Sequence, residues 1–537
     1  MRWPDEIGES ELDLALQSIQ QPLILLPAGG NPGRWKLLHG SSNGGGHAIP
    51  RGAAFVPALP PERLGDGSFC RELGLRYPYV AGAMANGIGS TTLVEAMSRG
   101  GMLGFFGSAG LPVQEVERAI DRLSGTLGPA PFGFNLIHSP SEPHLEAAVV
   151  DLYLRRGVRL VEASAYMDLT LPVVRYRVHG IGRDAAGRLV TPNRIIAKTS
   201  RVEVARKFFS PPPELLLRQL VERREISRDQ AIMAGQIPMA QDIAAEADSA
   251  GHTDNQPALA LLPTMVALRN RIQQHFTYDV VLRVGAAGGI STPASAAAAF
   301  SLGAAFIVTG SVNQACLESG SSDAVREMLA KAEQADVMMA PAADMFEMGV
   351  KVQVLKRGTM FGMRAAKLWE IYRSQNSLDD IPAAERARLE KTLFRQPLEE
   401  VWKKTVDFFS QRDPSQLERA GVDARHKMAL VFRWYLGLAS HWANTGDPDR
   451  HLDYQIWCGP AMGAFNEWVK GSFLQEPKNR QVLTVALNIL YGAAVMQRAQ
   501  MLRCQGVEFA PMIPNLSPRP LSELQKRLQR TTAESVL

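Results

Sequence analysis

Residues 282–311 read LRVGAAGGISTPASAAAAFSLGAAFIVTGS, and this stretch decides the fold. Its apolar runs are short and continuous, its turns are rich in glycine, and the alanine-rich middle is long enough for a helix. The pattern predicts, in order, a buried strand over Val280–Ala286, a turn at Gly288-Gly289, a helix opened by Ser291 or Thr292 with Pro293 in its first turn, and a buried strand over Ala304–Thr309. This strand–helix–strand unit is typical of a parallel sheet covered by helices.

Both predicted strands end in glycine, at Gly288-Gly289 and at Gly310-Ser311. Glycine lets the backbone approach a ligand closely, and free amides near a helix start favour an anion. In an eight-stranded α/β barrel, the loops after strands seven and eight commonly hold a phosphate. The pair therefore predicts a phosphate site. The alternative is that these glycines serve only turn formation and packing.

Composition limits the class of protein. The chain has 537 residues, 46% apolar and 21% charged, which is enough for a barrel-sized core and a second one. Its net charge is only +4, from 58 basic and 54 acidic residues, so a dominant nucleic-acid surface is not expected. The four cysteines show no metal-like spacing, so no metal is expected. No signal pattern or long apolar run stands out, so we expect a cytoplasmic protein without a membrane partner.

From Tyr77 the chain alternates short apolar runs with amphipathic segments. The runs predicted as strands are YPYVAGAMA, MLGFFGS, PFGFNLIH, RLVEASAY, RIIAKTS and MAQDIAAEADSAGH, followed by the two strands of residues 280–309. The segment VVRYRVHGIGRDAAGRLV is predicted as a local β excursion that turns near Asp184–Gly187. A count of eight favours an α/β TIM-type (β/α)8 barrel over an open doubly wound sheet, which remains the alternative.

The barrel is expected to carry an additional, mostly helical C-terminal domain. We assign residues 1–70 to an N-terminal preamble, 71–375 to the barrel, 376–510 to the helical domain and 511–537 to a tail. The methionine-rich segment Met338–Arg373 is expected to return over the barrel opening.

Several long motifs carry a family resemblance. GAMANGIGSTTLVEAMSRGGMLGFFGSAG, FGFNLIHS, VEASAY, ADSAGHTDN and the AAGGI…VTGS pair are similar to the flavin-dependent superfamily of nitronate monooxygenases and FabK-type enoyl reductases. The later DVMMAPAADMFEMGVKVQVLKRGTMFGMRAAKLWEIYRS and WCGPAMGAFNEWVKGSFL resemble its PfaD-type branch, the trans-acting enoyl reductases of polyketide and polyunsaturated fatty acid synthases. The resemblance extends from about Pro60 to Gln505.

The resemblance implies one FMN at the C-terminal mouth of the barrel. Ala83 and Met84 would lie along the flavin ring, and Asn135 would bond the ring or the ribityl chain. The phosphate would lie against Gly288, Gly289, Gly310 and Ser311, in agreement with the glycine pattern described above. For Met84 the alternative is core packing, and for Asn135 it is a strand-end amide that caps a loop.

The resemblance also points to a histidine. The superfamily has a catalytic histidine in an EAGGH motif, and here the motif reads Asp248-Ser249-Ala250-Gly251-His252. Asp248 stands for the glutamate and joins the expected cofactor site, while Ala250 replaces a glycine, although alanine tolerates positive φ poorly. Lys198, at the end of the fifth strand, is the second catalytic candidate. It could bind the cofactor, stabilise an enolate, or only pair with Glu162 or Asp248.

The function implied is FMN-dependent reduction, with NADPH as co-substrate, of enoyl thioesters on an acyl carrier protein. The proton would come from His252, Lys198 or water. The alternatives are a nitronate monooxygenase and a non-catalytic protein that assembles a synthase. Docking of an acidic carrier protein would use basic residues after the barrel, and we expect Arg357, Arg364, Lys367, Lys403 and Lys404. A homodimer is compatible with the sequence, which does not distinguish NADPH from NADH.

Overall fold

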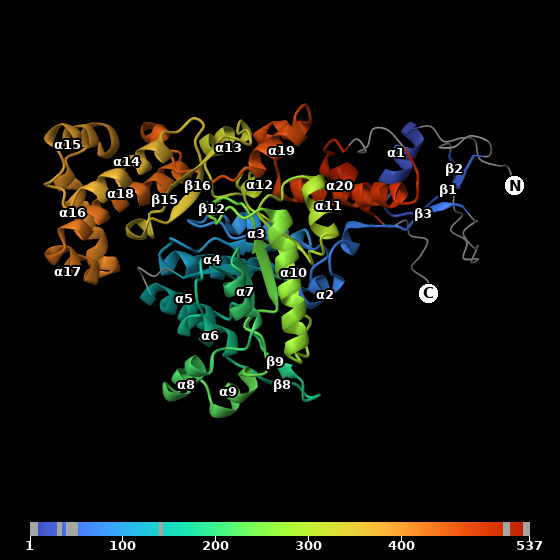
Figure 1. The fold of residues 1–537 in the computed structure, drawn as a ribbon, viewed down its shortest axis with the longest axis horizontal. Helices are drawn as coiled ribbons and strands as arrows, with labels where there is room; N and C mark the ends of the chain where they lie inside the picture. Colours follow the sequence, from blue (N-terminus) through green and yellow to red (C-terminus); the bar gives the residue numbers. More distant parts are fainter. Residues whose placement is uncertain (1–8, 29–34, 39–51, 139–142, 509–515, 530–537) are drawn as a thin grey trace.

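In the computed structural model, residues 9–28, 35–38, 52–138, 143–508 and 516–529 are described. Eight parallel strands close into a barrel at the centre of the molecule (Figure 1). In sequence order they are β4 (Tyr79–Ala81), β5 (Leu103–Phe106), β6 (Gly133–Ile137), β7 (Leu160–Ser164), β10 (Arg194–Thr199), β11 (Asp242–Glu246), β13 (Arg283–Ala287) and β14 (Ile307–Thr309). β14 pairs with β4, so the sheet has no free edge and the predicted barrel is confirmed.

The stretch that decided the fold forms β13, α11 (Pro293–Ser301) and β14. Thr292 is the N-cap, and its Oγ1 accepts a hydrogen bond from Ser295 N at 3.2 Å. Every residue of β13 and β14 is buried, as expected for parallel strands covered on both faces.

Most barrel strands are followed by a helix that covers the outside of the sheet. These helices are α3 (Thr91–Arg99), α4 (Val113–Leu127), α5 (Pro143–Arg156), α6 (Leu171–Val178), α7 (Val202–Phe209), α10 (Ala258–His275) and α11. At the amino-terminal end of the barrel the chain adds α8 (Glu214–Glu222), α9 (Arg228–Ala234) and the hairpin of β8 (Gly182–Arg183) and β9 (Leu189–Val190).

The predicted β excursion is only partly correct. Asp184–Gly187 does lie in the turn of the β8–β9 hairpin, but residues 171–178 form helix α6. Thr170 caps this helix, Pro172 lies in its first turn, and Val173, Val174 and Val178 are buried. Burial of one apolar face outweighs the strand preference of these valines.

The methionine-rich segment forms a hairpin over the barrel mouth. β15 (Val337–Pro341) pairs antiparallel with β16 (Lys351–Leu355), and β16 pairs with the two-residue strand β12 (Gly251–His252). The turn of this hairpin contains the short helix η2 (Phe346–Met348). Because β12 follows β11 directly, this sheet attaches the segment to the carboxyl ends of the barrel strands, as expected.

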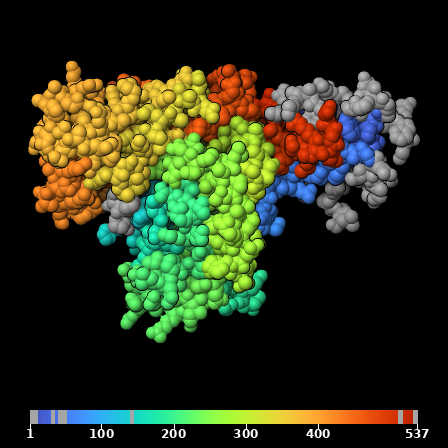
Figure 2. All heavy atoms as spheres, in the orientation of Figure 1, coloured from blue at the N-terminus to red at the C-terminus, as the bar shows by residue number. Residues whose placement is uncertain are grey.

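A helical lobe projects sideways from the barrel beyond this hairpin (Figure 2). It contains α14 (Phe361–Ser374), α15 (Ala383–Leu389), η3 (Glu390–Phe394), α16 (Leu398–Arg412), α17 (Pro414–Val422), α18 (Ala424–Thr445) and η4 (Pro448–Asp453). A buried aromatic group that includes Phe346, Phe394 and Phe432 ties the hairpin turn to these helices.

The last long helix returns to the barrel. The helix after β14, α12 (Ser311–Gln314), has only four residues. α20 (Val482–Arg503) packs against α11 and α3, which flank the position where a longer eighth helix would cover the sheet. Among the described helices α20 alone has the length and apolar composition to cross a membrane, but 83% of its most apolar window is buried inside the protein. It is therefore best explained as a core helix.

The remaining elements lie before the barrel in sequence or between the barrel and the C-terminus. At the amino-terminal side they are α1 (Glu9–Gln17), β1 (Leu23–Pro27), β2 (Trp35–Leu38), β3 (Ala54–Val56), η1 (Pro61–Arg63) and α2 (Gly67–Leu73). Between the barrel and the C-terminus they are α13 (Asp323–Ala330), α19 (Ala461–Val469), η5 (Phe473–Gln475), η6 (Pro477–Asn479) and α21 (Leu521–Leu528).

Candidate active site at the barrel mouth

A lysine and two glutamates meet at the mouth. Lys198 Nζ lies 3.2 Å from Glu246 Oε1 and 3.9 Å from Glu162 Oε2. Glu162 is fully buried, and its Oε2 accepts a hydrogen bond from Ala83 N at 3.0 Å. Burial opposes the charge on Lys198, but the two carboxylates outweigh it and raise the pKa of the ammonium. Lys198 is thus a fixed cation beside the end of the first strand.

The first and third strand ends also contribute. Ala83 and Met84 are half-buried at the start of the loop after β4. Asn135 is buried, and its amide nitrogen donates to Glu162 O and to Ser164 Oγ, both at 3.0 Å. Both of its N–H donors are therefore used within the protein, so a ligand would meet its Oδ1.

Gly288-Gly289 and Gly310 follow two neighbouring strands, β13 and β14, and are called here the glycine cradle. Gly288 and Gly289 both have left-handed φ, +76° and +73°. A Cβ on Gly288 would lie 2.6 Å from Ala247 O, whereas a Cβ on Gly289 or Gly310 would meet nothing within 4 Å. Gly288 is therefore needed for packing, and the other two glycines border open space.

A distant segment closes one side of this cradle. Gly459 N donates to Ser311 Oγ at 3.2 Å, and a Cβ on Gly459 would lie 3.0 Å from Ala250 N. The WCGPAMG segment thus lies between the ends of the sixth and eighth strands. Nearby Ser291 is fully buried, and its Oγ has no hydrogen-bond partner among the described residues.

His252 lies on β12 and pairs with Asp344, with Nε2 3.2 Å from Oδ1. Its side chain is about 34% exposed. Burial lowers its affinity for a proton, but the Asp344 carboxylate outweighs burial and raises the pKa of His252. Glu246 also raises the pKa of His252, whereas Lys198 lowers it. The left-handed residue of the loop is Gly251, so alanine at position 250 requires no positive φ.

Asp248 fixes the loop that carries His252. Its Oδ1 accepts hydrogen bonds from Asn255 Nδ2 and Gln353 Nε2, both at 2.8 Å, and Gln353 also donates to Ser249 O at 2.8 Å. Ser249 Oγ in turn donates to Glu246 Oε1 at 3.2 Å. Asp248 therefore holds the loop that carries His252 through Asn255 and Gln353. The carboxylate nearest to Lys198 is Glu246, not Asp248.

The structure places the candidate site residues of the sequence in or after the barrel strands; Asn135 lies in the middle of β6, and His252 lies on β12, after the end of β11. Their roles stay predictions. Sequence reasoning missed Glu246, Asp344, Gln353 and Gly459. Glu246 could have been found as the last residue of the sixth strand. Asp344 is 92 residues from His252 in sequence, and only the β12–β16 pairing brings the two together.

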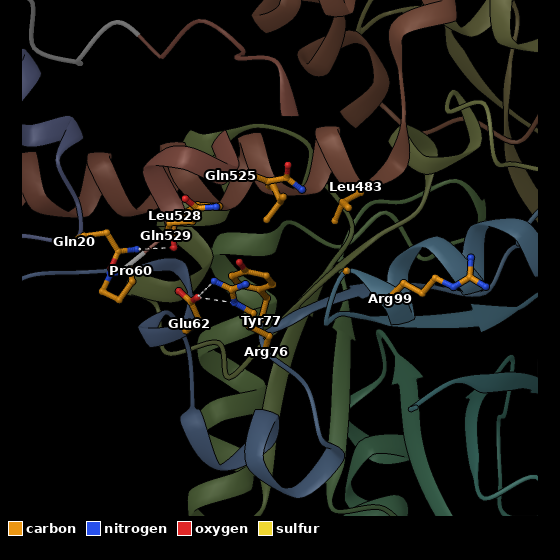
Figure 3. A pocket seen from close by; sticks show the side chains of 12 residues that line it. Gln20, Pro60, Glu62, Arg76, Tyr77, Arg99, Leu483, Gln525, Leu528 and Gln529 are labelled. Atoms are coloured by element: carbon orange, nitrogen blue, oxygen red, sulfur yellow. Dashed lines mark hydrogen bonds and ion pairs between the residues drawn. The ribbon is translucent and has the colours of Figure 1, made fainter. Parts of the chain in front are cut away.

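A cavity of about 660 Å³ lies away from this mouth (Figure 3). Its lining includes Arg76 and Tyr77, just before β4, and Gly100, just before β5. Arg76 is paired with Glu62 at 2.7 Å. These positions precede the barrel strands, whereas barrel chemistry lies where the strands end. We therefore place the candidate site at the mouth.

Barrel, mouth and helical lobe together define an α/β-barrel protein with a candidate active site at the mouth, and similar proteins specify its family. Residues 375–454 match the family described as acyl-carrier-protein S-malonyltransferase, inserted helical domain. The chain is similar to a protein of the polyunsaturated fatty acid synthase of Thraustochytrium, with 50% identity over 447 residues, covering 82% of this chain and 30% of that protein. It is also similar to the polyketide biosynthesis protein PksE of Bacillus subtilis, with 44% identity over 444 residues, covering 82% of this chain and 58% of that protein.

A solved structure supports the same assignment. The enoyl reductase domain of MlnA, from the macrolactin cluster of Bacillus amyloliquefaciens, is 39% identical with a TM-score of 0.78. The match covers 83% of this chain and 99% of that domain. The chain therefore belongs to the PfaD-type family of trans-acting enoyl reductases of polyketide and polyunsaturated fatty acid synthases. It spans 30% of the length of the Thraustochytrium relative and 58% of the length of PksE.

Proposed function

We propose that this chain is an FMN-dependent enoyl reductase that uses NADPH to saturate enoyl thioesters carried by an acyl carrier protein. The observation that carries the proposal is a His252–Asp344 pair, a Lys198–Glu246 pair and a glycine cradle, all at one barrel mouth. Family membership, with relatives named for polyketide and polyunsaturated fatty acid synthesis, supports the reaction class.

The residues at the cradle fit the phosphate of FMN. Gly289 and Gly310 border open space, Ser291 has a buried hydroxyl oxygen without a described partner, and Ser311 is oriented by Gly459. Lys198 and the Asn135 Oδ1 would hold polar atoms of the ring or the ribityl chain. When bound, FMN would supply the hydride chemistry, taking hydride from NADPH and giving it to the β-carbon of the enoyl group.

His252 is the group suited to complete the reduction. Hydride addition at the β-carbon leaves charge on the thioester enolate, and one proton at the α-carbon balances the reaction. Asp344 raises the pKa of His252 and so favours the protonated imidazolium, the form that can act as the acid. Lys198 also carries a proton, but Glu246 and Glu162 hold that proton tightly. We therefore assign proton donation to His252, and charge stabilisation to Lys198.

The test is anaerobic conversion of a crotonyl thioester on a carrier protein, with NADPH, to a product two hydrogens heavier by mass. His252→Ala should lower the rate on the order of a hundredfold or more. Lys198→Met should raise KM or reduce cofactor retention without the same loss of proton transfer. Rapid O₂ uptake on a nitronate, with no mass gain on the enoyl thioester, would identify a nitronate monooxygenase instead.

A further inference from the structure

The helical lobe contains a hollow that the proposed reaction does not use. Its volume is about 490 Å³, and it opens among the turn of the β15–β16 hairpin, α14, and the junction of α17 with α18. It is lined by Glu347, Trp369, Tyr372, Arg373, Arg419, Asp423, Arg425 and His426. The lining contains three arginines, two acidic residues and two aromatic rings, so positive charge exceeds negative charge at the hollow.

Two of these arginines have no acidic partner among the described residues. Arg373 makes no described hydrogen bond or ion pair. The guanidinium carbon of Arg425 lies 4.8 Å from the Tyr372 ring centroid, and the guanidinium donates a hydrogen bond to Tyr372 O at 3.4 Å. Both side chains are exposed. Arginine donors displayed in this way over an aromatic surface suit a carboxylate or phosphate partner.

The acids at the hollow are already engaged. Asp423 Oδ1 accepts hydrogen bonds from Arg425 N and His426 N, both at 3.0 Å, and so caps α18. Glu347 Oε1 pairs with His426 Nδ1 at 2.9 Å and with Arg419 at 3.3 Å. The free positive charge therefore belongs to Arg373 and Arg425.

A short turn of the β15–β16 hairpin connects the hollow to the candidate active site. Asp344, which holds His252, is three residues before Glu347, which is fixed at the hollow. Two exposed apolar side chains stand at its border, Met348 after Glu347 and Val422 before Asp423, at 65% and 91% exposed. Unpaired arginines flanked by apolar side chains are typical of a protein-docking surface.

Two of the cations expected from sequence, Arg364 and Arg357, are engaged in ion pairs, whereas Lys404 is exposed and contacts Gln396 and the Trp434 ring. Arg364 pairs with the fully buried Asp453, together with Arg395 and Arg450, and its side chain is only 15% exposed, so its charge is already engaged inside the protein. Arg357 is paired with Glu333 at 2.9 Å and Asp336 at 2.8 Å. The sequence showed where basic residues occur but not which of them already have partners.

We propose that the Arg373–Arg425 hollow is where the acidic surface of the acyl carrier protein docks, beside the mouth that receives its thioester. This inference rests on the proposed function for its choice of partner. The choice of this surface rests on two guanidinium groups without an acidic partner among the described residues, on the exposed apolar side chains at the border, and on the connection to Asp344.

The test compares two double variants with the same charge change. Arg373→Glu with Arg425→Glu should raise KM for a crotonyl acyl carrier protein at least tenfold and weaken binding of that protein, measured by calorimetry, by a similar factor. The rate with crotonyl N-acetylcysteamine, which has no carrier, should not change. The control is Arg223→Glu with Arg228→Glu. Both residues are exposed, Arg223 at the end of α8 and Arg228 at the start of α9, and these helices lie at the opposite end of the barrel (Figure 1). The variant should behave as the unaltered protein.

Unchanged carrier binding in the Arg373/Arg425 variant, or equal losses in both variants, would overturn the proposal. A rise in KM for NADPH with normal carrier binding would assign the hollow to a dinucleotide phosphate and also overturn it. If the unaltered protein reduces neither thioester, the proposed function fails, and the calorimetric comparison still decides the docking site.

Discussion

At the residue scale, the mouth holds two basic side chains, Lys198 and His252, that differ in how many carboxylates they contact and in their exposure. Lys198 lies between two carboxylates, one of them fully buried, whereas His252 meets one carboxylate and is partly exposed. A group with a raised pKa keeps its proton below that pKa and loses it as pH rises through it. His252, which is partly exposed, can therefore exchange its proton with solvent more readily than Lys198, whose proton two carboxylates hold.

This contrast predicts the pH dependence of reduction. If the imidazolium is the active form, activity should fall as pH rises, with a midpoint above 6.5, the ordinary pKa of a histidine side chain. Asp344→Asn removes the charge that raises this pKa and leaves burial, which lowers it, so the midpoint should move down. Rate profiles of kcat/KM against pH for both proteins measure the shift. A midpoint that stays in place in Asp344→Asn would contradict the assignment.

The glycine cradle makes a second prediction at this scale. Gly289→Glu and Gly310→Glu place a carboxylate where the phosphate is proposed, so FMN released by heating the purified proteins should fall to trace levels. Gly289→Ala is the control for backbone strain alone, which costs about 1–2 kcal/mol at left-handed φ. Gly288→Ala should destabilise more, because its Cβ also meets Ala247 O. Wild-type FMN content in both glutamate variants would reject the site.

At the scale of elements, α19 is held tightly where it leaves the mouth. A Cβ on Gly463 in this helix would lie 2.0 Å from Gln334 N, so the helix can approach residues 333–334 only with glycine there. Gly437 in α18 meets nothing within 4 Å.

The two glycines should therefore respond in opposite ways to the same change. Gly463→Ala should lower Tm and, because Gly459 precedes the helix, weaken FMN retention. Gly437→Ala should raise stability by about 0.5–1 kcal/mol, because alanine replaces glycine in a helix without a clash. Thermal unfolding of both variants checks the contrast, and a stabilised Gly463→Ala would show that α19 is not closely packed.

At the scale of the whole molecule, the end of the chain completes the barrel. α20 packs against α11 and α3, and Arg498, fully buried, donates to Ser18 O and Gln21 O near the start of the chain, at 3.1 and 2.8 Å. Loss of α20 would expose the apolar faces of both barrel helices.

Removal of residues 482–537 should therefore yield insoluble or unfolded protein, although the eight strands are all retained. Removal of residues 530–537 alone is the matched control and should leave soluble yield and circular dichroism unchanged. A soluble, cooperatively folding barrel without α20 would contradict this role.

The sequence by itself determined the eight strands, the glycine ends of β13 and β14 and the placing of His252 and Lys198, because these follow from local periodicity and from motifs that lie at strand ends. It misjudged residues 171–178, where burial on one side of a helix overrode the strand preference of valine. Tertiary structure alone decided the partners: Asp344 for His252, Glu246 for Lys198, Gly459 for Ser311 and Asp453 for Arg364. Each pair joins segments that are far apart in sequence, and no local pattern records which side chains folding will bring within hydrogen-bond distance.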